Sequence, residues 1–138
     1  MTRIDFYIAQ RYQFVPLACL VIEKAYKLEN TCYIHTESQQ QAAMIDEQLW
    51  TFKQNSFLPH ELYDAESDQD AAILIGYNQQ PGREFDVLIN LTEEVPVFFN
   101  RFTRVAEIVG TEEAPKKIAR ARYKYYRENG YELYNHSM

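Results

Sequence analysis

Two continuous apolar runs constrain the fold of this chain more than any other feature of its sequence. They lie at residues 71–76 and 86–91, and polar or Pro/Gly turns bound each of them. Strands with one solvated face alternate apolar and polar residues, whereas strands covered by helices on both faces are apolar throughout. The two runs therefore predict strands of a parallel sheet that lies between two layers of helices.

Further segments of strand and helix character alternate around these runs. β-branched and aromatic residues predict additional strands at 4–9, 31–36 and 103–109. Apolar spacing, Pro16, a capping-box sequence (Thr-Glu-Ser-Gln) and a final Gly130 predict helices. These helices cover 16–28, the segment after 36–39, 95–101 and 113–129.

Strands that alternate with helices of this length indicate an α/β fold. We expect a single domain over residues 1–138: a Rossmann-like open sheet, mostly parallel, with helices on both faces. Cys19 and Cys32 are isolated thiols in apolar segments and are expected to pack as small hydrophobic residues. No apolar run approaches the roughly 20 residues of a membrane span, and the first residues do not resemble a signal peptide. A soluble, cytoplasmic protein is expected.

The residues with which open-sheet α/β proteins bind nucleotides are missing from the expected places. The first strand-to-helix turn, residues 10–15, contains no glycine through which backbone N–H groups could approach a pyrophosphate. His35, at a predicted strand end with Glu37 nearby and Asn90 on a neighbouring strand, is the best catalytic candidate. A half-buried histidine bonded to backbone is the favoured interpretation. We expect no enzyme, no cofactor and no metal site.

Charge is distributed unevenly along the chain. Residues 1–100 carry six Lys/Arg against fifteen Asp/Glu, a net charge of −9, whereas residues 101–138 carry eight against five, a net charge of +3. Six of the fourteen cations lie between Lys116 and Arg127. A local basic site on an acidic molecule favours a small anionic ligand over a long duplex.

The basic segment predicts an amphipathic helix with a cationic stripe. At 100° per residue, one arc of roughly 100° holds the stripe residues Lys116, Arg120, Tyr123, Lys124 and Arg127. Ile118, Ala121 and Tyr125 lie on the opposite side and are expected to pack on the sheet. Cations beside an aromatic ring suit a carboxylate-rich peptide with an apolar end, although a solvated helix face is an alternative.

A second candidate surface is aromatic. Trp50 ends a predicted helix, and the loop beyond it continues with Phe57, Pro59 and His60 after Ser56. Large apolar groups in a loop commonly anchor a partner. The alternative is a satellite cluster that holds the loop on its own domain.

Several of these motifs occur together in one order along the chain. They are Asp5-Phe6-Tyr7, Tyr33-Ile34-His35-Thr36, Leu49-Trp50, Ser56-Phe57-Leu58-Pro59-His60, residues 86–91, and Arg120-x-Arg122-Tyr123-Lys124. In this order the chain resembles the chi subunit family of bacterial DNA polymerase III over essentially its whole length. The resemblance implies a Rossmann-like fold without catalysis, a monomer or heterodimer with no membrane contact, and only indirect contact with DNA.

The resemblance also implies two partners and their sites. The acidic tail of single-stranded DNA-binding protein, which ends in phenylalanine, would contact Val109, Lys116, Arg120, Tyr123 and Lys124. The psi subunit of the clamp loader would contact Trp50, Phe57, Pro59 and His60. A repair helicase is a further candidate partner. The alternative interpretation is a nucleotide- or nucleic-acid-binding protein that uses the basic helix for phosphates.

Overall fold

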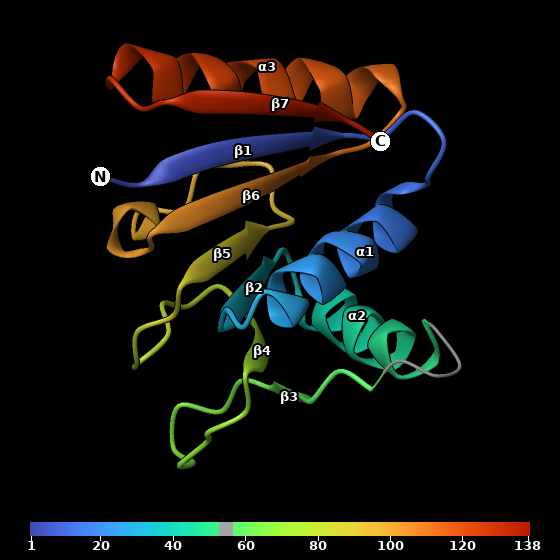
Figure 1. The fold of residues 1–138 in the computed structure, drawn as a ribbon, viewed down its shortest axis with the longest axis vertical. Helices are drawn as coiled ribbons and strands as arrows, with labels where there is room; N and C mark the ends of the chain where they lie inside the picture. The colour runs from blue at the N-terminus through green and yellow to red at the C-terminus, as the bar shows by residue number, and fades with distance from the viewer. Residues whose placement is uncertain (53–56) are drawn as a thin grey trace.

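The computed structural model of the chain describes residues 1–52 and 57–138. Its centre is a seven-stranded sheet in the order β3-β4-β2-β5-β6-β1-β7 (Figure 1), and every strand pairing in it is parallel. The strands are β1 Arg3–Ile8, β2 Cys32–Thr36, β3 His60–Leu62, β4 Ile73–Tyr77, β5 Val87–Asn90, β6 Arg104–Val109 and β7 Leu133–Ser137. The predicted α/β open sheet is confirmed.

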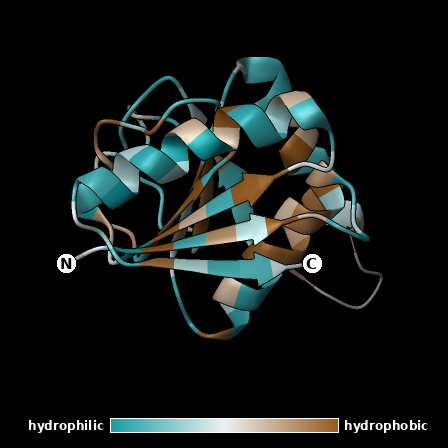
Figure 2. Ribbon diagram, turned by 90° about the horizontal axis from the view of Figure 1, so that it is seen from above, coloured by the Kyte–Doolittle hydropathy of each residue, from teal (hydrophilic) through white to brown (hydrophobic). Residues whose placement is uncertain are grey.

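Helices cover both faces of this sheet, as predicted. The helices are α1 Phe14–Lys27, α2 Gln39–Thr51, the 3-10 turn η1 Phe99–Arg101, and α3 Glu113–Glu128. One core cluster joins α1 and α2 to the sheet, and a second cluster joins α3 and η1 to the opposite face. Figure 2 shows largely hydrophobic strands inside the molecule, whereas α3 and most of β7 are hydrophilic.

The central strands are buried because both of their faces are covered. All residues of β5 and nearly all residues of β4 are shielded from solvent, which explains their continuous apolar sequence. Cys19 and Cys32 lie in the core, where burial raises the pKa of the Cys19 thiol to about 11 and that of Cys32 to about 12.

Some local expectations differ from the structure. The predicted helix at 95–101 is only the short η1, and strands β3 and β7 were not predicted. The capping box lies two residues later than expected: Ser38 Oγ accepts from the Gln41 N–H at 3.1 Å, and the Gln41 side chain accepts from the Glu37 N–H at 2.7 Å. Thr36 instead donates its hydroxyl to the Gly76 carbonyl across the sheet.

Candidate partner-binding surfaces

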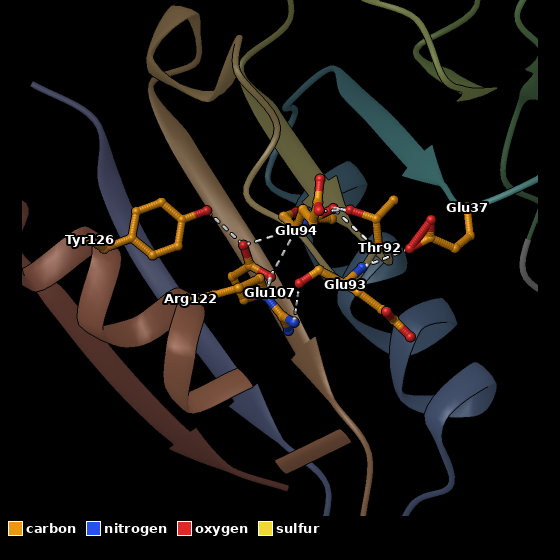
Figure 3. Close-up of polar contacts among 8 residues, drawn as sticks. Glu37, Thr92, Glu93, Glu94, Glu107, Arg122 and Tyr126 are labelled. Carbon is orange, nitrogen blue, oxygen red and sulfur yellow. Dashed lines mark hydrogen bonds and ion pairs between the residues drawn. The ribbon is translucent and has the colours of Figure 1, made fainter. Parts of the chain in front are cut away.

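A buried polar network fixes α3 on the sheet (Figure 3). The fully buried Glu107 carboxylate of β6 accepts hydrogen bonds from Arg122 Nε at 2.8 Å and from the Tyr126 hydroxyl at 2.6 Å. Asn90 of β5 donates to both carboxylate oxygens, at 3.1 and 3.0 Å. Arg122 also donates to the Glu93 carbonyl at 3.2 Å. The helix is therefore held at one rotation about its axis.

The network contains only donors around Glu107. Burial raises the pKa of the Glu107 carboxyl, while the Arg122 charge and the hydrogen bonds from Tyr126, Asn90 and Arg122 oppose that rise. Burial and the neighbouring carboxylate also raise the pKa of Tyr126, which keeps its hydroxyl a donor. Four donor contacts are the arrangement that an ionised, acceptor-only carboxylate requires.

The face of α3 that packs on the sheet is not the predicted one. Its buried residues are Ala119, Arg122 and Tyr126, whereas Ala121 and Tyr125 are exposed and Ile118 is half-buried. The prediction assigned the buried face from Ile118, Ala121 and Tyr125 and gave Arg122 no place in it. In the structure, Arg122 is an internal partner of Glu107, and its position rotates the buried face toward it.

The cationic stripe is nevertheless directed outward. Arg120 and Lys124 are exposed, while Lys116 and Tyr123 are half-buried. Arg120 lies 3.5 Å from Glu113 and Lys124 lies 3.8 Å from Glu128. Such exposed pairs contribute little to stability, so these cations remain accessible to another carboxylate.

The aromatic member of this stripe is Tyr123. Its ring meets the Phe6 ring of β1 edge-to-face at 5.2 Å, in the same cluster that buries Val109. Val109 is only 5% exposed, so in this conformation its side chain belongs to the core and offers little surface to a ligand.

The aromatic surface lies at the other end of the sheet. Trp50 at the end of α2 is 54% exposed and Phe57 is 70% exposed, with their ring centroids 5.9 Å apart. Pro59 is half-buried beside them, and Ser56 lies outside the described residues. Two exposed aromatic rings in mutual contact form a compact apolar patch, as protein interfaces require.

Buried neighbours anchor this patch. Leu58 is in the core, and the His60 ring is buried with Nδ1 2.5 Å from the Leu58 carbonyl and Nε2 2.9 Å from the Asp46 carbonyl. The Trp50 ring lies 4.3 Å from the His60 ring. His60 therefore supports Trp50 from beneath, and the side chains available to a partner are those of Trp50 and Phe57.

The catalytic candidates do not converge on one point. His35 Nδ1 is buried without a hydrogen-bond partner in the described structure, and burial lowers the pKa of its ring. The Glu37 carboxylate accepts a hydrogen bond from the Glu93 backbone N–H at 2.8 Å (Figure 3). The Asn90 side chain donates to Glu107 and accepts from the Thr92 hydroxyl. The favoured interpretation, a histidine bonded to backbone, is wrong at Nδ1.

A cleft of about 680 Å³ lies at the carboxyl edge of the sheet, where α1 and α3 begin. The side chains of Phe14, Pro16, Pro115 and Ile118 line it, so the place that holds phosphates in nucleotide-binding sheets is mainly apolar here. Within residues 1–52 and 57–138, no cluster of three or more metal-ligating side chains occurs. No helix in the same ranges is long and apolar enough to cross a membrane.

Comparison with known proteins supports one family. Residues 1–134 match the family model described as DNA polymerase III chi subunit, HolC. The "DNA polymerase III subunit chi" of Pseudomonas aeruginosa is 40% identical over the full chain and 98% of its own length. The Escherichia coli protein of the same description is 32% identical over 85% of this chain and 80% of its own length.

Solved structures with a similar fold are more distant in sequence. T4 UvsW matches 99% of this chain with a TM-score of 0.66 and 8% identity, over 41% of its own length. S. cerevisiae Dbp5 matches 98% with a TM-score of 0.66 and 11% identity, over 42% of its own length. At such identity the likeness concerns the fold alone. The full-length sequence matches instead identify the chain as a member of the DNA polymerase III chi subunit family.

Proposed function

We propose that this chain is a non-catalytic adaptor of the replicase clamp loader that holds two partners at once. One partner is the acidic C-terminal tail of single-stranded DNA-binding protein, bound at the cationic stripe. The other is the psi subunit, bound at the aromatic patch of Trp50 and Phe57. The observation that carries the proposal is the placement of these surfaces at opposite ends of one rigid sheet (Figure 1).

The chemistry of the stripe fits an acidic tail with an apolar end. Lys116, Arg120 and Lys124 recur every four residues and can neutralise successive carboxylates. The Arg120 guanidinium suits a bidentate contact with a terminal carboxylate. Tyr123, above Phe6, offers the aromatic edge for a terminal phenylalanine.

A binding titration tests this assignment. An Asp-rich peptide ending in Phe is expected to bind with micromolar affinity, about −8 kcal/mol. Arg120→Ala should cost on the order of 2 kcal/mol, and binding should weaken as salt screens the exposed charges. Removal of the peptide's terminal Phe is expected to abolish most of the binding. Equal binding of an all-Asp peptide, or tighter binding of a bare oligonucleotide, would instead indicate a general polyanion site.

A further inference from the structure

Strand β7 leaves one edge of the sheet open beside the cationic stripe. It is the last strand in the sheet order, and among the described residues it pairs only with β1. It has five residues, contains no proline or lysine, and is largely exposed. Natural sheets commonly protect such edges with charge, proline or extreme shortness, and β7 shows none of these.

The hydrogen-bond pattern shows which backbone groups of β7 face outward. Ile4 N–H donates to the Glu132 carbonyl at 3.1 Å, and Met138 N–H donates to the Ile8 carbonyl at 2.9 Å. Because a parallel ladder uses alternate residues, the even-numbered positions of β7 bond to β1. The N–H and C=O groups of Leu133, Asn135 and Ser137 therefore point away from the sheet.

The rotation of α3 directs its cations toward this same edge. Arg122 points inward to Glu107 of β6, whereas Tyr123 lies over Phe6 of β1, nearer to β7. The direction around the helix axis that leads from Arg122 to Tyr123 leads on to Lys116, Arg127 and Arg120. These three side chains therefore lie beyond β1, toward the β7 edge. Figure 1 shows α3 running along β7 at this end of the molecule.

We infer that β7 is a docking edge at which an extended acidic peptide adds as an eighth strand beneath the cations of α3. The inference rests on the proposed tail binding and specifies its mode. Backbone hydrogen bonds to Leu133, Asn135 and Ser137 hold the peptide in register. Side chains on one face of the added strand then point toward α3, where carboxylates meet Lys116, Arg120 and Arg127.

Charge decides between an acidic peptide and a second copy of this chain. Two β7 edges in contact would bring two cationic stripes together, and like charges that face each other oppose association. An acidic strand instead neutralises the stripe. The opposite edge strand, β3, has only three residues and is not covered by a basic helix.

Residue-resolved amide hydrogen exchange tests the inference. It is measured on the full chain with and without an Asp-rich peptide that ends in Phe. The amides of Leu133, Asn135 and Ser137 are expected to exchange rapidly in the free chain and to gain at least about ten-fold protection when the peptide is bound. Those of Tyr134 and His136 already bond to β1 and should change little. Protection that depends on protein concentration without peptide would indicate self-pairing and would overturn the inference.

A matched pair of substitutions provides a second measurement. Asn135→Pro removes an outward N–H without removing a bond to β1, and proline is tolerated on such edges. It is expected to weaken peptide binding about five-fold, as the loss of one net hydrogen bond predicts, whereas Asn135→Ala should bind normally.

The outcomes separate this inference from the proposed function. If the peptide binds, Arg120→Ala weakens it, and the three outward amides stay unprotected, the tail lies on α3 without strand addition and the inference is wrong. If the peptide does not bind the wild-type chain at all, the proposed tail binding and the strand addition both fail.

Discussion

Two arginines two positions apart on α3 have different roles at the scale of single residues. Arg122 is buried against Glu107, whereas the Arg120 side chain is 66% exposed. A buried ion pair does not always stabilise a fold more than an apolar pair would, but removal of one partner leaves an uncompensated buried charge. Arg122 is therefore a structural residue of the sheet interface, and Arg120 is available for a ligand.

Unfolding in urea should separate these two roles. Arg122→Ala is expected to lower the free energy of unfolding by about 3–5 kcal/mol, because the Glu107 carboxylate loses its charged partner. The matched control Arg120→Ala should change it by less than about 0.5 kcal/mol, because its ion pair is exposed. Similar losses in both variants would contradict the assignment of Arg122 to the core.

Trp50 should affect binding without affecting the fold. Its ring is half exposed and rests on the buried His60, so truncation removes contact surface rather than core. Trp50→Ala is expected to cost more than about 2 kcal/mol in psi binding, measured by calorimetry, with an unchanged unfolding midpoint. A folded Trp50→Ala that still binds psi normally would show that the aromatic patch is structural.

At the scale of elements, burial determined what could be predicted from the sequence. The strands β4 and β5 were predictable because both of their faces are buried, one against α1 and α2 and the other in the cluster that contains Phe85 and Phe98. β7 was not, because an edge strand with the sequence Leu-Tyr-Asn-His-Ser has little hydrophobic pattern. The buried network had one visible signal, Glu107 within an apolar strand, but its partner Arg122 could be assigned only once the helix rotation was known.

The connection from α3 to β7 depends on one backbone conformation. Gly130 ends the helix with φ of 82°, a region that residues with a side chain rarely adopt. Gly130→Ala should therefore destabilise the domain by about 1 kcal/mol, although no atom lies within 4 Å of the added Cβ. Gly110→Ala is the control, since its φ is not positive and its new contacts at 3.8 Å or more are ordinary. Equal stability of Gly130→Ala and wild type in urea would refute the assignment.

At the scale of the whole molecule, the sheet separates the two proposed binding surfaces, which differ in chemistry. The aromatic patch adjoins β3 at one end of the strand order, and the cationic stripe lies over β1 and β7 at the other end. Among the described residues, the two surfaces have no residue in common, and they adjoin different core clusters. We therefore expect the two partners to bind independently, without competition and without strong coupling.

Two calorimetric titrations test this claim most directly. In one, the Phe-ended acidic peptide is titrated into the chain alone, and in the other it is titrated into the preformed complex of the chain with psi. The adaptor account predicts one peptide per chain, with dissociation constants that agree within about two-fold in both titrations, since coupling between separate sites should be far below 1.4 kcal/mol. Loss of peptide binding in the psi complex, or no binding to either form, would contradict it.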